Sequence, residues 1–285
     1  MSEEANKVLN ETVHSLSEAV ETIPDGAKIA MGKTFPMAIV REIIRQQKRN
    51  LHLIGMPIAG LPADLLAGAG AVSIVEAGAV TLGSDGIPAA FLRATKEGQV
   101  ERRRSSCSLI VASLVGGAAG APFVALPGLL GSDLLVDRPD IKVIDNPLVP
   151  GEKTAIAPVI RPDFALIHAR RADLDGNLVV ASIGDEALLA RSAFHLIATV
   201  ESISADALDK IERDEEIIPA LYADAIIPDP WGTYPFPSSS FPKRDERAIQ
   251  EWLAAAQNPD ETRDWIQRNL GSGTDESRYR QEINQ

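Results

Sequence analysis

Three short glycine-containing segments near the start of the chain could bind a ligand through their backbone. Each follows an apolar run, and glycine lets backbone N–H groups approach a ligand closely. In an open parallel sheet such turns meet at the carboxyl ends of the strands, where these folds bind their ligands. We therefore expect one shared site, lined by Gly32, Lys33 and Thr34 of the first segment, Gly55, Ala59 and Gly60 of the second, and Gly83, Ser84 and Asp85 of the third.

Nucleotide binding is an alternative for these segments, and the sequence argues against it. The first segment holds no Gly-x-Gly-x-x-Gly pattern, and Gly32-Lys33-Thr34 lacks the preceding glycine of a phosphate-binding loop. Glycine is also the ordinary residue of a strand-to-helix turn, so each segment taken alone could be structural. Their joint position is what favours a site.

Histidine and cysteine offer few candidates for nucleophilic or metal chemistry. His14 falls in an expected terminal helix and His52 at the start of an expected strand, with no base and acid visibly paired to them. His168 ends an apolar run, so a structural and a catalytic role both stay open. No His-Glu-x-x-His motif or clustered His/Asp spacing predicts a metal site. The lone Cys107 excludes an internal disulfide, and we expect a buried structural thiol.

The elements that must position these residues alternate between short β-like runs and helical patterns, which is typical of a parallel sheet covered by helices. A first amphipathic helix is expected over residues 3–21. Beyond Val100, several short apolar runs lie close together and indicate an antiparallel extension or a sheet edge. The expected strands are 28–31, 51–54, 72–75, 123–125, 142–144, 154–160, 164–169, 178–181, 195–200 and 223–227, and the helices between them are 36–47, 61–69, 87–95, 106–115 and 186–191.

The last part of the chain has a different composition. Residues 228–244 hold five prolines and four aromatic residues, and a loop of this length is expected to be functional or to wrap on a partner. Two amphipathic helices are expected after it, at 245–256 and 259–270. The expected organisation is an α/β domain at 1–227 and a segment at 228–285 that packs on this domain or on a partner.

Composition and charge exclude several classes of function. The 285 residues are 45% hydrophobic and carry a formal net charge of -12, which suits one large core but not a nucleic-acid groove. Arg102-Arg103-Arg104 is a local exception that could be a salt-bridged surface or an anion site. The longest apolar stretch, 109–130, is broken by glycine and proline, so no membrane span is expected. The first residues show no secretory signal, and we expect a cytoplasmic protein.

The stretch from Ile144 to Val179 carries a family resemblance. It joins a Pro/Gly-rich loop at 146–151 to two apolar runs and ends in a turn at 173–177. Together with segment 25–32, Asp-Gly-Ala-Lys-Ile-Ala-Met-Gly, it resembles the A chain of glutaconate CoA-transferase and the wider family I CoA-transferases. The resemblance implies an α/β fold with an open, mainly parallel sheet and flanking helices.

The same resemblance implies a mechanism and a partner. Family I enzymes work through a glutamate carboxylate that attacks the acyl-CoA thioester, and this glutamate lies in a Ser-Glu-Asn-Gly turn of the B half. The comparable turn here, 55–60, contains no glutamate. An A-type chain without a catalytic residue of its own is therefore implied, with a B-type partner that supplies the nucleophile in a heterotetramer or larger. Coenzyme A would be a substrate together with a carboxylic acid, and no cofactor is implied.

Glu101 keeps an alternative open, and Glu76 needs a separate interpretation. Some members of the family hydrolyse acyl-CoA or open rings of CoA-linked substrates with a glutamate on the A-type chain, and Glu101 stands at the comparable place. A second carboxylate is missing from the run that follows, 102–107, which disfavours this alternative. Glu76 lies in a segment similar to the catalytic turn but follows the third expected strand, so we expect a structural or partner-facing role for it.

Overall fold

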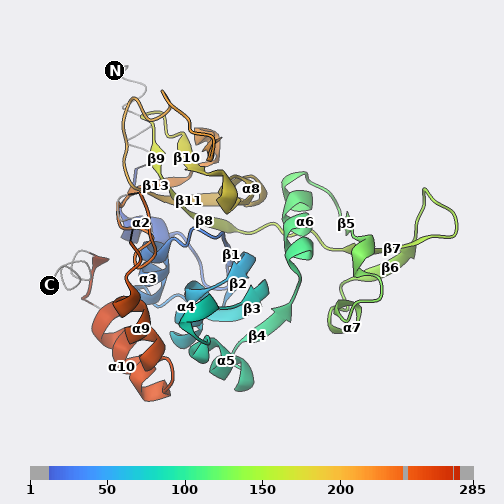
Figure 1. The fold of residues 1–285 in the computed structure, drawn as a ribbon, viewed down its shortest axis with the longest axis horizontal. Helices are drawn as coiled ribbons and strands as arrows, with labels where there is room; N and C mark the ends of the chain where they lie inside the picture. The colour runs from blue at the N-terminus through green and yellow to red at the C-terminus, as the bar shows by residue number, and fades with distance from the viewer. Residues whose placement is uncertain (1–12, 240–242, 272, 277–285) are drawn as a thin grey trace.

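A parallel β-sheet forms the centre of the molecule (Figure 1). The structure is a computed structural model that describes residues 13–239, 243–271 and 273–276. The strands of the main sheet are β1 (Lys28–Met31), β2 (Leu51–Ala59), β3 (Val72–Val80), β4 (Glu101–Arg104), β8 (Phe164–Ala169), β11 (His195–Val200) and β13 (Ala225–Pro228). Within the described residues these seven strands have the order β13-β11-β8-β1-β2-β3-β4, and all neighbours are parallel. The expected α/β fold class is confirmed.

Both faces of the sheet are buried at its central strands, which explains why these strands read as continuous apolar runs. All six residues of β8 are buried. Successive side chains of a strand point to opposite faces, so Phe164 and Leu166 join one hydrophobic core while Ala165 and Ile167 join the other. The sheet therefore separates two cores, and its polar ends are free to carry the chemistry.

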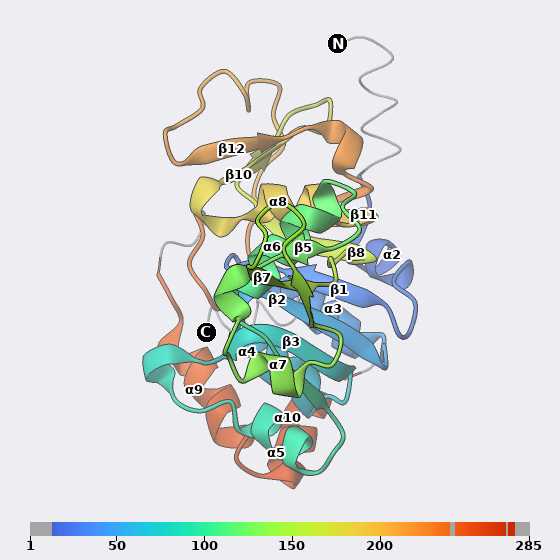
Figure 2. The ribbon, with the colours of Figure 1, turned by 90° about the vertical axis from the view of Figure 1, so that its right-hand side faces the viewer.

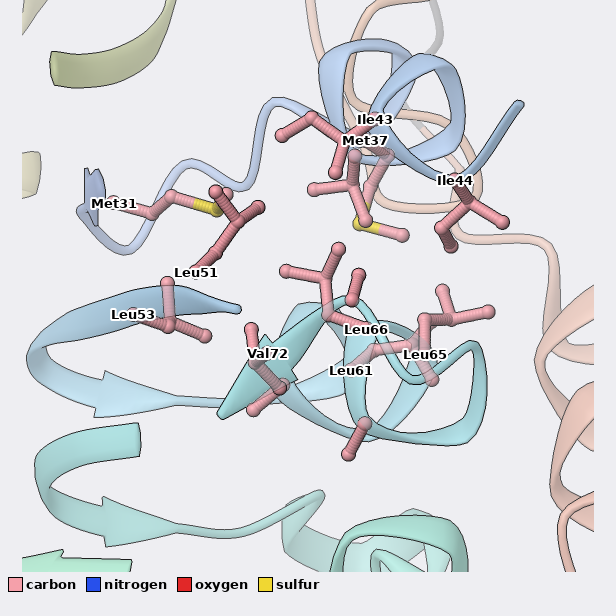
Figure 3. Packing of buried hydrophobic residues seen from close by; sticks show 14 of the residues in the cluster. Met31, Met37, Ile43, Ile44, Leu51, Leu53, Leu61, Leu65, Leu66 and Val72 are labelled. Atoms are coloured by element: carbon pink, nitrogen blue, oxygen red, sulfur yellow. The ribbon is translucent and has the colours of Figure 1, made fainter. Parts of the chain in front are cut away.

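Helices cover each face of the sheet. The helices on the first core are α2 (Leu16–Glu21), α3 (Met37–Arg45), α4 (Leu61–Gly68) and α5 (Ala89–Lys96). Figure 3 shows this packing, with Met37 and Ile43 of α3 opposite Leu53 of β2 and Leu66 of α4. The second core is closed by α6 (Cys107–Ala118) and α8 (Glu186–Ser192). No helix within the described ranges has the length and apolar character needed to cross a bilayer.

Residues 123–157, which we call the arm, project away from the main sheet. Figure 1 shows the arm extending beyond α6, and in Figure 2 it lies toward the viewer, in front of β2 and β3. It contains β5 (Val124–Ala125), α7 (Leu134–Asp137), β6 (Lys142–Asp145), β7 (Lys153–Ala157) and the short η2 (Pro127–Leu129). Its strands pair antiparallel in the order β5-β7-β6 around a small core of their own. The expected runs 142–144 and 154–160 thus form an antiparallel extension, whereas run 164–169 is strand β8 inside the main parallel sheet.

A second antiparallel sheet lies beside β8 and β11. It has the order β12-β10-β9 and consists of β9 (Arg171–Ala172), β10 (Leu178–Ala181) and β12 (Glu215–Ile218). Two further short helical turns, η3 (Ser182–Gly184) and η4 (Ala220–Tyr222), border it. The sequence did not predict β9 or β12, since β9 has two residues and β12 opens with two glutamates.

The C-terminal segment returns to the first core. Figure 1 shows the chain running from β13 along the molecule to α9 (Glu246–Ala255) and α10 (Pro259–Leu270). Trp252 of α9 is 1% exposed, and its indole N–H donates to Asp64 of α4 at 2.9 Å. Helices α9 and α10 thus pack on the first core.

Several boundaries differ from those expected. Most of the expected helix at 3–21 falls on residues 1–12, which lie outside the described part, and only Leu16–Glu21 is seen as a helix, capped by Ser15. The segment Arg102-Arg103-Arg104 belongs to the edge strand β4. Charged side chains are common on edge strands, where they hinder pairing with other chains. β2 continues to Ala59 and β3 to Val80, because pairing between the two strands extends past a register shift at 55–58.

Candidate functional site

A cavity of about 380 Å³ opens where three parallel strands end. Thr34 follows β1, His168 lies near the end of β8, and Glu201 follows β11 directly. Because β1, β8 and β11 are parallel, their carboxyl ends share one edge of the sheet, which is the usual ligand position in such folds. The remaining wall is formed by Arg170, Ala181 and the loop Pro237-Ser238-Ser239.

The imidazole of His168 is held in place on one side and faces a carboxylate on the other. Its Nδ1 lies 2.9 Å from Thr199 Oγ1, and its Nε2 lies 3.6 Å from Glu201 Oε1. A Cβ atom at position 232 would stand 2.7 Å from both Nδ1 of His168 and Oγ1 of Thr199, so this loop position requires glycine. His168 is 4% exposed and Glu201 is 9% exposed. The pair is therefore buried at the base of the cavity.

Glu201 is fixed by the loop that closes the cavity. The Ser239 N–H donates to Glu201 Oε1 at 2.9 Å. Residues on either side of Ser239 in the sequence make further contacts. The ring of Phe236 packs on Phe35 with ring centroids 5.2 Å apart, and Arg244 forms an ion pair with Asp85. Residues Pro237, Ser238 and Ser239 of the Pro/aromatic segment therefore form one wall of the cavity.

A second buried carboxylate lies beneath the first turn. Glu186, at the start of α8, is 1% exposed, and its Oε1 accepts a hydrogen bond from the Thr34 N–H at 3.3 Å. Burial raises the pKa of Glu186 above its ordinary value, and hydrogen bonds from Thr34 oppose this only in part. Its other oxygen, Oε2, has no hydrogen-bond partner among the described residues. Burial therefore favours the protonated form of Glu186 more than water would.

The residues of the first predicted segment lie together at this edge. Gly32 packs so closely on the backbone that an added Cβ would stand 2.8 Å from the carbonyl oxygen of Gly184. Lys33 is exposed, and its Nζ lies 3.8 Å from an Asp185 carboxylate oxygen. Thr34 is the one residue of the nine predicted positions that lines the cavity described above.

The residues of the second and third segments do not line this cavity. Gly55 and Ala59 belong to β2, in a bulge where an added Cβ at Gly55 would stand 2.6 Å from Ala59 Cβ. Gly60 abuts the ring of Phe35, with an added Cβ only 2.8 Å from it. Gly83, Ser84 and Asp85 form the short helix η1, which the Arg244 ion pair connects to the closing loop. The description of residues 55–60 as a turn was thus wrong, because β2 continues to Ala59 and pairs with β3 on both sides of the bulge.

Sequence reasoning missed the partners of His168. Glu201, Thr199 and Glu186 are ordinary polar residues in their local sequence, and only the sheet brings them beside His168 and Thr34. The one local signal was position, since Glu201 directly follows the apolar run 195–200 as a strand-end carboxylate.

The other candidate residues lie away from the cavity. Glu76 is 3% exposed and is bound by Arg138 of the arm at 2.8 Å, with His52 Nε2 3.3 Å away, which agrees with a structural role. Glu101 is exposed and pairs with Arg103 at 3.0 Å. Cys107 is exposed at the start of α6, so the expectation of a buried thiol was wrong. No group of three metal-ligating side chains occurs in the described part of the chain.

Comparison with known proteins places this geometry in a family. Residues 13–229 match the sequence model for Coenzyme A transferase. The chain is 33% identical over 282 residues to the A chain of 3-oxoadipate CoA-transferase from Pseudomonas knackmussii, with 94% of this chain and 97% of that protein covered. It is 30% identical over 247 residues to the A chain of glutaconate CoA-transferase from Acidaminococcus fermentans, covering 78% and 76% of the two chains.

Solved structures agree with this fold. The crystal structure of glutaconate coenzyme A-transferase from Acidaminococcus fermentans superposes with a TM-score of 0.85 at 24% identity, over 95% of this chain and 92% of that one. A variant of the decarboxylase AibA/AibB superposes with a TM-score of 0.78 at 31% identity, over 90% and 100%. The family model and the A-type relatives, which extend over most of the chain, show that this protein belongs to the coenzyme A transferase family as an A-type chain.

Proposed function

We propose that this chain is the A-type component of a heteromeric CoA-transferase that moves CoA from an acyl-CoA to a carboxylic acid. The observation that carries the proposal is the 33% identity, over nearly the whole of both chains, to the A chain of a CoA-transferase. The decarboxylase AibA/AibB has a similar fold and 31% identity, so fold alone does not select the reaction. The reaction must be argued from the site.

The carboxylates at the sheet edge support a nucleophile that comes from another chain. A carboxylate that attacks a thioester must be ionised and must reach the carbonyl carbon. Glu186 is buried with a raised pKa, and Asp85 is held by Arg244. Glu201 lies at the base of the cavity and accepts the Ser239 N–H. These carboxylates are suited to positioning, and the attacking glutamate is assigned to the B-type partner.

In the proposed reaction the partner's carboxylate attacks the thioester carbonyl, the C–S bond breaks, and CoA leaves as the thiolate. The thiolate then attacks the glutamyl carbonyl of the anhydride and releases the first acid, and the second acid takes the CoA by the reverse steps. The segments containing Gly32, Gly60 and Gly83 would surround the acyl end of the substrate, together with the polar cavity at His168 and Glu201. The acyl group, rather than the CoA portion, is therefore the part that this chain is proposed to select.

Three assays separate the possible reactions. The full-length chain alone should show no CoA exchange between an acyl-CoA and a free acid, and adding a B-type chain should restore it. Hydroxylamine or borohydride trapping of the working complex should modify a glutamate of the partner. Hydrolysis without an acceptor acid would favour the acyl-CoA hydrolase alternative, and release of CO₂ would favour a decarboxylase. Robust exchange by the isolated chain would reject the two-chain proposal.

We further propose that the complex is a heterotetramer or larger and works in the cytoplasm. Native mass spectrometry of the purified complex and fractionation of the source cells test these two points.

A further inference from the structure

The arm ends in a loop that contacts little of its own chain. Residues 146–152, which we call the tip loop, connect β6 to β7 at the far end of the arm, remote from the main sheet (Figure 1). The loop contains the Pro/Gly-rich motif that the sequence analysis singled out, and the candidate site makes no use of it. This motif therefore needs another explanation.

Apolar side chains are exposed on the tip loop and on the strand leading to it. Leu148 is 87% exposed and Val149 is 42% exposed, and Val143 of β6 is 44% exposed. Single exposed apolar residues are common on protein surfaces, but contiguous ones at a protruding end indicate a site of association. Pro147 and Pro150 flank the two aliphatic residues. The sequence Pro-Leu-Val-Pro thus presents a compact apolar end.

The tip loop is ordered by its own hydrogen bonds. The Asn146 N–H donates to the Glu152 carbonyl at 2.9 Å, which closes the loop at its base. The Leu148 N–H donates to the Asn146 side chain at 3.0 Å, and Lys153 pairs with Asp145 at 2.9 Å just below. A loop that already holds its shape loses little conformational entropy on binding. The tip loop therefore has a defined shape before it binds a partner.

The arm itself is fixed to the main sheet. Arg138 of the arm is 8% exposed, and its guanidinium donates to Glu76 Oε1 of β3 at 2.8 Å and to the Arg104 carbonyl at 3.1 Å. The arm core also includes Leu109 of α6. The tip loop is therefore held at a set position relative to the candidate site.

We propose that the tip loop inserts Leu148 and Val149 into a concave apolar surface of the B-type partner chain. The inference rests on the proposed function, which requires such a partner. The inference assigns the contact to the arm. Because the arm is fixed to the main sheet, this contact would set the position of the partner's glutamate relative to the sheet edge.

A second copy of this chain fits the tip loop less well. A symmetric contact between two tip loops of seven residues each would bury far less than the roughly 1,200 Å² of a specific interface. Insertion into another copy needs an apolar receiving cavity. Four cavities of the described residues, of 250 to 550 Å³, each have ionisable side chains in their walls. Each copy also carries the same net charge of -12.

The test compares variants of the full-length chain for binding to a B-type chain co-expressed with it. Leu148→Ser combined with Val149→Ser should weaken the affinity by roughly 30-fold or more, as expected when central apolar contacts are removed. Leu221→Ser is the matched control, since Leu221 is 81% exposed in η4, outside the arm. Circular dichroism and thermal melting of the free chains should be unchanged in both variants. Saturating partner should restore turnover in the tip-loop variant.

Each outcome decides a different point. Full affinity of the double variant, with an active wild-type complex, would overturn the inference and leave the proposed function standing. A wild-type chain that binds no B-type chain would overturn both. Self-association of the free chain that the double variant abolishes, with partner binding intact, would assign the tip loop to a second copy instead. A photocrosslinking residue at position 148 gives an independent readout, and crosslinks to the B-type chain are expected.

Discussion

The side chains of His168 and Glu201 form a buried polar pair in the wall of the cavity. His168 Nε2 has no hydrogen-bond partner among the described residues, although Glu201 Oε1 lies 3.6 Å away. A buried polar atom without a partner costs free energy, and a polar substrate group placed beside the imidazole would satisfy it. The pair is therefore suited to recognise a polar group of the acyl chain.

We expect His168→Gln and Glu201→Gln each to lower kcat/KM for CoA transfer by about tenfold or more. Each substitution removes the native hydrogen-bonding group, and a hydrogen bond of this kind contributes roughly 1.5–3 kcal/mol. Steady-state kinetics of the reconstituted complex measures this effect. His195→Gln is the control, because His195 is exposed at the opposite end of β11. Equal loss in all three variants would indicate a general folding defect, and unchanged kinetics would place acyl recognition elsewhere.

The buried carboxyl of Glu186 should make the stability of the protein depend on pH. Burial raises its pKa in the folded state, so the folded protein binds the proton more tightly than the unfolded chain does. Its contribution to the free energy of unfolding is then most favourable at low pH and is lost as pH rises through the folded pKa. Glu186→Gln removes this loss. The variant should melt at a higher temperature than wild type near about pH 8, and the difference should vanish toward about pH 4.

Differential scanning calorimetry across this pH range checks the prediction. A constant difference at every pH would mean that packing, and not ionisation, separates the two proteins.

Gly60 has a steric reason to be glycine. A Cβ added at this position would stand 2.8 Å from the ring of Phe35, so the side-chain space is already filled. Phe35 in turn packs on Phe236 of the closing loop. Gly60→Val should displace this wall and lower turnover by about tenfold, while assembly with the partner stays intact. Kinetics and size-exclusion chromatography of the same variant decide between a site effect and a failure to assemble.

At the scale of elements, a buried ion pair between Arg138 and Glu76 helps to fix the arm to β3. Burial raises the pKa of Glu76, but His52 and Arg138 more than offset this, so the pKa of this carboxyl lies below its ordinary value. Glu76→Gln removes one of the two carboxylates that bind Arg138, which keeps Asp140 at 2.8 Å, and should cost about 1–3 kcal/mol of stability above pH 5. Because the folded pKa is lowered, wild type gains this stability above the unfolded pKa and loses it as pH falls through the folded one.

Urea unfolding at neutral and acidic pH measures the difference. The gap between Glu76→Gln and wild type should narrow in acid, and a gap independent of pH would contradict the ionic origin. Glu101→Gln is the control, because Glu101 is exposed and pairs with Arg103 at the surface.

At the scale of the whole molecule, the C-terminal helices are part of the main core. Trp252 packs edge-on against Trp265 with centroids 5.1 Å apart and donates to the buried Asp64. Trp252→Ala should cost about 3–5 kcal/mol by opening a cavity, in addition to the lost hydrogen bond. Trp252→Phe, which keeps most of the volume, should cost less. Urea unfolding ranks the two variants, and equal stability would show that the helices pack loosely on the domain.

The local sequence determined much of this protein. The alternation of apolar runs with helical patterns indicated a parallel sheet, because strands that are buried on both faces are apolar along their whole length. The resemblance at 144–179 indicated the family, which the comparisons confirm. The absence of glutamate from residues 55–60 is also a property of the sequence alone, and it led to the proposal of a partner.

Only the tertiary structure decided which residues meet. Thr34 and Glu186 are 152 positions apart in the sequence. They touch because β1 and β8 are neighbours in the middle of the sheet, although they are far apart along the chain. The cavity at His168 depends on the same pairing and on a loop that returns from β13. The length of β2 was likewise set by pairing with β3 across a bulge. Local patterns specify how each segment folds, but these contacts arise from the order of strands, which depends on packing over the whole chain.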